Sequence, residues 1–427
     1  MKVIDAICGA GKTSYAIQMI NDSYKGVLKE EPKYIFVTPF ISEVERIEKE
    51  TNNKLVAPND KSGTKSLHVK KLIEEENSIV MSHELFSKID EETLSDIEFN
   101  NYILIMDEVA NVLENLKVSK KDIEYLMKAN AIEVGEKGKV NWIDETYGSN
   151  ENERFRDIMI HSENENLYIL KNTALFWTMN VKAFSSFKEI YILTYLFEGQ
   201  IQKYYYEFHE IKYEKYSVQY KDNKYVLVDY NAKNDCRENI VQLLNVYEDY
   251  KKSTGRESKL NSNFGAKDGK GSQYYLSSTW FKNANNEDLD IIRRNLNNYF
   301  RNYASAENSK IFWTTKKDIA SKLKGAKCIF NKKDDRDKDN FIPMNTRATN
   351  LKGGCVSVAY VYNRFMNPIE KKFFEERGIK VDQDLLAVSD LIQFLFRGCI
   401  RNNQVMNCYI PSKRMRDLLY MWMNYEL

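Results

Sequence analysis

The amino-acid sequence predicts an α/β protein in which parallel strands alternate with helices and form two sheet domains in tandem. Short apolar runs recur along the chain, and segments with helical spacing follow them. The first run, 3–7, leads into a glycine-rich turn, and a later run, 101–106, ends in two carboxylates. Strands that alternate with helices form parallel sheets with right-handed crossovers. The same rhythm starts again near residue 271, which indicates a second domain of the same class.

The glycine-rich turn after the first strand predicts a phosphate-binding loop. It reads Ala-Ile-Cys-Gly-Ala-Gly-Lys-Thr from Ala6 to Thr13, with alanine in place of the first glycine of the usual pattern. Such a loop directs backbone N–H groups at phosphate oxygens, and the helix start adds a partial positive charge. Lys12 is expected to reach the β- and γ-phosphates, and Thr13 to bind Mg²⁺. The alternative is an ordinary glycine turn. The expected nucleotide-binding residues are Cys8, Gly9, Ala10, Gly11, Lys12, Thr13 and Ser14.

The carboxylate pair Asp107–Glu108 predicts a catalytic metal site. It follows the apolar run 101–106, and ligands bind at the carboxyl ends of strands in an open α/β sheet. Asp107 is expected to hold Mg²⁺, and Glu108 to orient and deprotonate the attacking water. Adjacent carboxylates repel each other unless a cation lies near them, so the pair itself favours a metal. The alternative is a solvated strand end.

Composition excludes several classes of protein. The 427 residues are enough for two or three domains, and a net charge of +1 gives no overall basic character. The six cysteines lack zinc-site spacing, so reduced thiols are expected. No apolar run approaches 18 residues, and Met1-Lys2-Val3 leads straight into the first strand. We therefore expect a cytoplasmic protein without a membrane span or signal peptide.

The boundaries of the two domains follow from where the rhythm weakens. A first domain is expected at 1–205, with an inserted helical or irregular segment at 118–187. A boundary region is expected at 206–270, and the second domain at 271–427. Within these limits the sequence predicts β-structure at 202–230, a helix at 236–251, a mobile loop at 255–271, strands at 274–279, 310–315, 355–362 and 407–411, and an amphipathic helix at 385–400.

Taken together, these motifs give the chain a family resemblance. It resembles superfamily 2 helicases and translocases, most of all the DEAD/DEAH-type helicase-like proteins encoded by phages and their bacterial hosts. Residues 6–13 resemble motif I and 107–110 motif II; weaker matches to motifs Ia, Ib, III, IV and V lie at 37–39, 82–83, 193–195, 277–280 and 345–350. The resemblance implies two RecA-like domains with nucleic acid held across both. The nucleic-acid contacts that it implies are Thr38, Pro39, Ser82, His83, Ser278, Thr346, Arg347 and Thr349.

The segment from Gln393 to Arg401 is similar to motif VI of that family. Arg397 keeps the family's spacing from Gln393, whereas Arg401 comes one residue late. A spacing of four residues predicts that both arginines lie on one helix face. The resemblance implies that Gln393, Arg397 and Arg401 are catalytic, with a guanidinium at the γ-phosphate. The alternative is a helix face that pairs with acids such as Asp382 or Asp390.

The resemblance implies a nucleic-acid-dependent ATPase that uses ATP and Mg²⁺ to unwind or translocate on DNA or RNA, of which we favour DNA. A phage-encoded protein of this kind would act in the cytoplasm of the bacterial host. The residues before motif I do not resemble a Q motif, so the preference for ATP over other nucleotides stays open. Two alternatives remain: an ATPase motor without strand separation, and a nucleotide-binding switch or scaffold regulated by a protein partner. Which protein partners the chain has is unknown from the sequence.

Overall fold

The computed structural model divides the chain into two compact units, which are described separately. It describes residues 1–23, 31–61, 63–147, 153–251, 256–257, 260–261, 272–325, 327–331, 339–344 and 352–427. The first unit contains Met1–Ala6, Gly11–Tyr230 and Asn367–Val381. The second contains Ile7–Ala10, Asn231–Met366 and Asp382–Leu427. Four residues of the expected phosphate loop are therefore assigned to the second unit, although the loop's flanking strand and helix belong to the first.

A seven-stranded sheet forms the centre of the first unit, in the order β12-β11-β1-β10-β4-β2-β3. All neighbours pair in parallel except β11 and β12, which form an antiparallel hairpin. Its strands are β1 (Lys2–Asp5), β2 (Tyr34–Thr38), β3 (Ile79–Ser82), β4 (Ile103–Asp107), β10 (Glu189–Thr194), β11 (Glu214–Lys221) and β12 (Lys224–Asp229). The central strands are almost continuously apolar because helices cover both faces of a parallel sheet.

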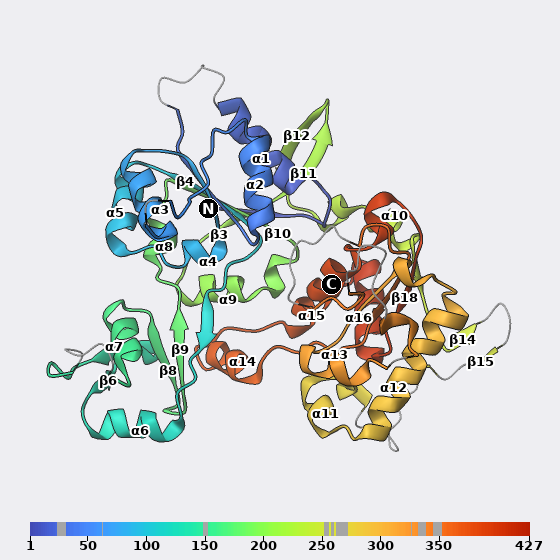
Figure 1. Cartoon of the computed structure of the whole chain (residues 1–427). Helices are drawn as coiled ribbons and strands as arrows, with labels where there is room; N and C mark the ends of the chain where they lie inside the picture. Colours follow the sequence, from blue (N-terminus) through green and yellow to red (C-terminus); the bar gives the residue numbers. More distant parts are fainter. Residues whose placement is uncertain are drawn as a thin grey trace. The chain divides into compact units, whose positions relative to one another are not determined.

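The helices of this unit connect the strands as crossover elements (Figure 1). They are α1 (Lys12–Ser23), α2 (Ile41–Glu50), α3 (Lys65–Glu74), α4 (His83–Phe86), α5 (Glu91–Phe99), α8 (Lys182–Ser185) and α9 (Ile201–Phe208). Side chains cap several of them: Thr64, Ser82 and Asp90 accept hydrogen bonds from the first turns of α3, α4 and α5. Together with the second unit below, this architecture confirms the predicted tandem of parallel-sheet domains.

The insertion predicted as helical or irregular is wrong in character, because it contains a small β-sheet. Its strands are β5 (Leu113–Asn115), β6 (Ile132–Val134), β7 (Val140–Trp142), β8 (Leu167–Leu170) and β9 (Ala174–Thr178), and its helices α6 (Lys120–Lys128) and α7 (Arg156–Glu163). An antiparallel sheet forms in the order β5-β9-β8, and β6 pairs with β7. A separate core includes Ile123, Val140, Leu167 and Leu175. Strands this short leave too few residues for a visible alternation.

The segment 367–381 packs with the first unit, although it was predicted to lie in the second domain. Its helix α14 (Pro368–Glu375) buries Phe373 and Phe374, and the Phe373 ring lies 4.6 Å from that of Phe176. Arg377 then donates to the carbonyl oxygens of Lys137 (3.0 Å) and Ile169 (3.2 Å). Its guanidinium also lies 3.8 Å from the Phe373 ring. These tertiary contacts carry no periodic signal in the sequence, so the sequence could not place the segment.

We expect His209, at the end of α9, to make the stability of this unit pH-dependent. Burial lowers the pKa of His209 to about 4, and Lys137 acts in the same direction. Between pH 6.5 and 4, His209 is therefore protonated in the unfolded chain but neutral in the folded chain. The free energy of unfolding consequently falls as the pH is lowered through this window. His209→Phe should reduce that loss in denaturant titrations at pH 7 and pH 4.5. An unchanged difference between the two pH values would contradict this assignment.

The second unit contains a four-stranded parallel sheet in the order β13-β18-β17-β16. The strands are β13 (Leu244–Val246), β16 (Ile311–Thr314), β17 (Ser357–Tyr360) and β18 (Met406–Tyr409). The helices are α10 (Arg237–Val241), α11 (Ser278–Asn283), α12 (Asn286–Asn298), α13 (Lys317–Leu323), α15 (Gln383–Leu395) and α16 (Lys413–Met423); a short hairpin pairs β14 (Tyr250–Lys251) with β15 (Arg256–Glu257). None of the helices in the described part of the chain has the length and apolar character to cross a membrane.

Several local predictions are wrong. The strand expected at 274–279 is a turn followed by α11, because Ser277 accepts a hydrogen bond from the N–H of Trp280 and caps a helix. The helix expected at 236–251 ends at Val241, and β13 follows. The β-structure expected at 202–230 begins with α9, and β11 and β12 come only after it. The predicted helix at 385–400 ends at Leu395. Most of the loop expected at 255–271 lies outside the described residues.

Candidate nucleotide-binding site

The predicted phosphate loop lies between β1 and α1 with the backbone that such a loop needs. Gly9 and Gly11 have φ values of 85° and 96°, a region that favours glycine. The helix begins at Lys12, whose ammonium donates to the carbonyl oxygen of Ala6 at 2.6 Å. The N–H of Tyr15 bonds to the Gly11 carbonyl oxygen, so the loop runs directly into the first helical turn. This arrangement places a helix N-terminus and a lysine at one point, where an anion is favoured.

The first turn of α1 contacts the predicted metal site at the end of β4. The Thr13 hydroxyl donates to Asp107 Oδ2 at 3.2 Å, which joins residues 94 positions apart. Burial and then the neighbouring Glu108 raise the pKa of Asp107 to about 7, although Lys12 and Thr13 oppose this. A cation beside this carboxyl group would favour its charged form and lower the pKa again. The Thr13 hydroxyl and the Asp107 carboxylate are the two oxygen groups that could hold such a cation.

Glu108 has an unusual backbone conformation at the end of β4. Its φ is 66°, in the left-handed region that is unfavourable for a residue with a long side chain. Its N–H donates to the Leu193 carbonyl oxygen at 2.8 Å, and the next turn is fixed by Gln202, which accepts from the Ala110 N–H at 2.8 Å. Strain of this kind is tolerated where the surroundings over-determine it, and it is concentrated at functional sites. No pattern in the sequence indicated either this strain or the role of Gln202.

The carboxyl ends of neighbouring strands form one row at this edge of the sheet. Thr38 pairs with Ser82, and Leu193 pairs with both Asp107 and Ile4. The Thr38 and Thr194 side chains are completely buried, and their hydroxyls have no hydrogen-bond partner among the described residues. Thr38 was predicted to contact nucleic acid, but its buried side chain does not face solvent in this structure. The Thr194 carbonyl oxygen accepts from the Ala6 N–H at 3.2 Å, so the predicted motif III contacts the phosphate-loop strand.

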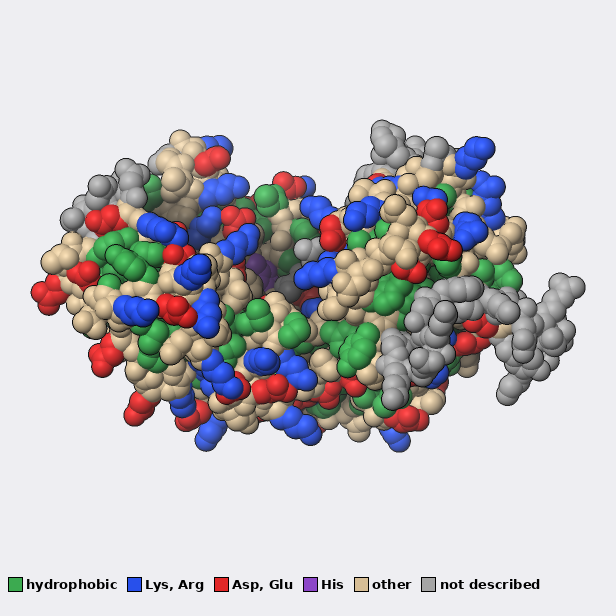
Figure 2. Space-filling model, turned by 90° about the horizontal axis from the view of Figure 1, so that it is seen from below, with side chains coloured by type: hydrophobic (Ala, Val, Ile, Leu, Met, Phe, Trp, Pro, Cys, Tyr) green, Lys and Arg blue, Asp and Glu red, His purple; other side chains and the backbone are tan. Residues whose placement is uncertain are grey.

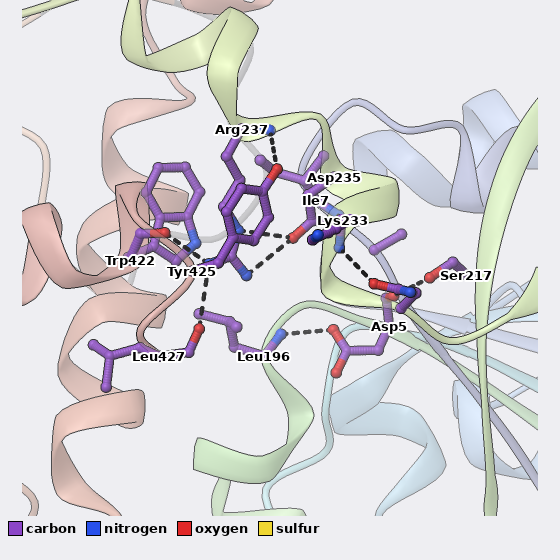
Figure 3. Close-up of polar contacts among 12 residues, drawn as sticks. Asp5, Ile7, Leu196, Ser217, Lys233, Asp235, Arg237, Trp422, Tyr425 and Leu427 are labelled. Carbon is purple, nitrogen blue, oxygen red and sulfur yellow. Dashed lines mark hydrogen bonds and ion pairs between the residues drawn. The ribbon is translucent and has the colours of Figure 1, made fainter.

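Two buried carboxylates hold the ends of this loop region (Figure 3). Asp5 accepts from the N–H groups of Leu196 (2.8 Å) and Phe197 (3.0 Å) in the first unit. In the second unit, Asp235 accepts from the Ile7 N–H at 3.2 Å. Arg237 is completely buried and bonds to Asp235. The residue types alone did not identify Asp5, Asp235 or Arg237, because their partners are distant in sequence.

Arg237 is anchored from a second direction (Figure 3). One of its terminal nitrogens donates to the carbonyl oxygens of Trp422 (2.7 Å) and Leu427 (3.2 Å). Its backbone N–H donates to the Tyr425 hydroxyl at 2.8 Å. The guanidinium therefore fixes Asp235 against the end of α16, and Asp235 in turn fixes the backbone of Ile7. A buried arginine with this many partners is costly to replace, because truncation would leave a buried carboxylate.

The arginines of the predicted motif VI do not lie on one helix face, so that prediction is wrong. Helix α15 ends at Leu395, two residues before Arg397, and Arg401 lies in a separate 3-10 turn, Cys399–Asn402. Arg397 is 6% exposed and donates to the carbonyl oxygens of Pro343 (3.4 Å) and Met344 (3.2 Å). Burial lowers its pKa to about 10. Gln393 donates weakly to Ser389 Oγ at 3.4 Å.

The other predicted nucleic-acid contacts have mixed positions. Pro39 is partly exposed beyond β2. Ser82 caps α4 by accepting from the Leu85 N–H, and His83 Nε2 lies 2.8 Å from the Asp107 carbonyl oxygen, which links this turn to the acid pair. Ser278 Oγ lies 2.7 Å from the Tyr362 hydroxyl in the second unit. Thr346, Arg347 and Thr349 lie outside the described residues.

The donor set at the loop fits Mg²⁺ bound together with a phosphate. This ion needs oxygen ligands and is held by one or two protein groups plus substrate phosphates. Thr13 and Asp107 supply two such oxygens, and Glu108 adds negative charge beside them. Over the described ranges, no group of three or more His, Cys, Asp or Glu side chains is placed to bind a metal by itself.

Two protein-family models match separate ranges of the chain. The family models of the YonV middle domain and the YonV C-terminal Rossmann-like domain match residues 113–177 and 238–423. The first range is the inserted β-sheet subdomain, and the second contains the four-stranded sheet. A solved structure, described as that of S. tokodaii Xpd4, gives a TM-score of 0.47 at 12% sequence identity. The match covers 100% of this chain and 94% of the Xpd4 chain.

A full-length relative extends the match to nearly every residue. The SPbeta prophage-derived uncharacterized protein YonV of Bacillus subtilis (strain 168) is 34% identical over 440 residues. The alignment covers 99% of this chain and 98% of the relative. Because the identity extends over nearly all of both chains, the protein belongs to the YonV family.

Proposed function

We propose that this protein is an ATPase of the helicase type, which couples ATP hydrolysis to movement on nucleic acid, with DNA favoured over RNA. The observation that carries the proposal is the contact between Thr13 and Asp107. It brings the end of the glycine-rich loop to a carboxylate pair at the carboxyl edge of a parallel sheet. Phosphoryl transfer needs positioning and charge stabilisation at one such point, and little other chemistry from the protein.

Each residue at the loop has a defined task in this proposal. The backbone from Cys8 to Ser14 binds the phosphates, and Lys12 leaves the Ala6 carbonyl oxygen to neutralise the β- and γ-phosphates. Mg²⁺ held by Thr13 and Asp107 would balance charge on the leaving phosphates. Glu108 orients and deprotonates the attacking water. The prophage origin of the YonV relative supports a phage setting, in which the host cytoplasm would be the place of action.

We expect Arg397→Ala to lower kcat with little change in nucleotide affinity. Arg397 belongs to the second unit, to which Ile7–Ala10 of the phosphate loop are also assigned. An arginine that stabilises transferring phosphate is worth about 10³-fold in kcat or more. Steady-state kinetics would separate kcat from KM, and a melting curve would check folding. An unchanged kcat would make the Arg397 contacts with Pro343 and Met344 purely structural.

The proposed function is tested by steady-state ATP hydrolysis with and without single-stranded DNA, duplex DNA and RNA. We expect hydrolysis that one polymer stimulates, and Lys12→Ala supplies the inactive control. A strand-displacement assay then separates unwinding from translocation. Absence of hydrolysis under all of these conditions would contradict the proposal.

A second candidate is a nucleotide-dependent switch or scaffold that a protein partner regulates. The net charge of +1 favours it, because a protein that binds a long stretch of nucleic acid usually has a basic surface. Figure 2 shows basic and acidic side chains interspersed over the face in view. Robust hydrolysis that neither DNA nor RNA stimulates would favour this candidate over the motor.

A further inference from the structure

The hairpin of β11 and β12 extends the central sheet beside the phosphate loop. β11 pairs with β1, with Ile4 opposite Tyr216, and continues past the carboxyl end of β1 to Lys221. Strand β12 returns and packs against α1 (Figure 1). Because β1 ends at Asp5, the last residues of β11 and the first of β12 project beyond the sheet edge at which the loop begins. The hairpin tip thus borders the proposed nucleotide site.

Two tyrosines face each other across this hairpin tip. Tyr220 and Tyr225 are register partners, and their ring centroids lie 4.9 Å apart. The Tyr225 ring packs on Gly11 of the phosphate loop so closely that a Cβ at Gly11 would lie 2.1 Å from a ring carbon. Gly11 is therefore required here for close approach as well as for its φ. Tyr220 remains 61% exposed, so one ring contacts the loop and the other offers its surface to solvent.

Gln18 of α1 fixes the hairpin in this position. Its side-chain amide donates to the Tyr225 carbonyl oxygen and accepts from the Tyr225 N–H, both at 2.9 Å. This reciprocal pair ties the backbone of Tyr225 to the helix whose first turn carries Lys12 and Thr13. The distance between the aromatic rings and the phosphate loop is consequently set by two hydrogen bonds to a regular helix.

The order of strands in the sheet indicates on which side of the loop the phosphates and the base of a bound nucleotide would lie. β1 lies between β11 on one side and β10 on the other, and β4 with the acid pair follows β10. The metal and the γ-phosphate belong on the β4 side, next to Thr13 and Asp107. A nucleotide is extended, so its base must leave the loop on another side, and the hairpin supplies aromatic surface there. Aromatic rings stack on nucleobases of any sequence.

We propose that Tyr220 and Tyr225 form the nucleobase-contacting surface of the nucleotide site. This inference rests on the proposed function, because it requires a nucleotide on the loop from Cys8 to Ser14. It goes further in assigning base contact to a hairpin more than 200 residues after the loop in sequence. Tyr220 stacks on the base, and Tyr225 supports Tyr220 while covering Gly11.

The test compares the binding of ATP with that of inorganic tripolyphosphate, each with Mg²⁺, by calorimetry on the full chain. Both ligands contact the loop, but only ATP has a base. Tyr220→Ala should weaken ATP binding about 10-fold, a typical effect of losing one stacking partner. It should leave tripolyphosphate binding unchanged, and Tyr220→Phe should restore ATP binding. Tyr125→Ala removes another exposed tyrosine, which lies in α6, and should change neither affinity.

Each outcome separates this inference from the proposed function. If the wild-type chain binds both ligands and Tyr220→Ala leaves ATP affinity unchanged, the hairpin is not the base-contacting element, and the ATPase proposal survives. If Tyr220→Ala weakens both ligands equally, the pair only supports the loop, and the inference is again overturned. If the wild-type chain binds neither ligand, the proposed function fails and the inference fails with it.

Discussion

Lys12→Ala is expected to lower kcat for ATP hydrolysis by about 10²–10³-fold or more, the typical cost of removing one charge-stabilising donor from an active site. Lys12 is the only residue of the phosphate loop with a cationic side chain. Its ammonium rests on the Ala6 carbonyl oxygen, at the base of the loop, and needs only to rotate outward to meet a phosphate. Release of phosphate from ATP, measured at saturating Mg²⁺, would give the result directly.

A matched lysine elsewhere in the same unit controls for nonspecific loss of charge. Lys33 precedes β2 and forms a partly exposed ion pair with Glu76 at 2.6 Å, a contact worth at most about 1 kcal/mol. Lys33→Ala should therefore leave kcat near the wild-type value. Full activity in the Lys12→Ala variant would contradict the assignment of residues 6–13 as a phosphate loop, and would also contradict the proposed function.

Glu108→Gly is expected to abolish hydrolysis and, at the same time, to stabilise the protein. General-base residues contribute about 10²–10⁴-fold to rate, so loss of the carboxylate should lower kcat by that amount. Glycine accepts a φ of 66° without cost, whereas a strained non-glycine residue costs about 1–3 kcal/mol. The greater backbone freedom of glycine in the unfolded chain offsets part of this gain. We expect a net rise of about 1 kcal/mol in the free energy of unfolding, measured by denaturant titration.

Two further variants separate strain from charge. Glu108→Gln keeps the strained backbone and removes the charge that raises the pKa of Asp107. The stability difference between the Gly and Gln variants therefore reports the backbone. Asn101→Gly changes another left-handed residue, with φ 56°, in the turn before β4, and should leave hydrolysis unchanged. If Glu108→Gly is less stable than Glu108→Gln, the left-handed backbone at position 108 does not destabilise the protein, and the prediction is wrong.

The strongest local patterns in the sequence predicted the first domain well. The apolar runs at 34–38, 79–82 and 103–107 form buried parallel strands, because a continuous apolar stretch of this length fits only a sheet covered on both faces. The weaker patterns failed where a side chain decided the local structure. Ser277 caps α11 and so turns an expected strand into a helix. In the insertion, strands of three to five residues were too short to alternate visibly.

The sequence by itself determined the α/β class, the tandem of parallel-sheet domains and the positions of Lys12, Thr13, Asp107 and Glu108. These depend on local patterns: apolar runs, glycine spacing and polar residues at strand ends. Only the tertiary structure decided which distant groups support them. The Asp235–Ile7 bond, the contact of Tyr225 with Gly11 and the packing of Arg377 join residues that are roughly 200 or more positions apart. Contacts of that kind arise from how the sheet orders its strands, and no periodicity in the chain encodes them.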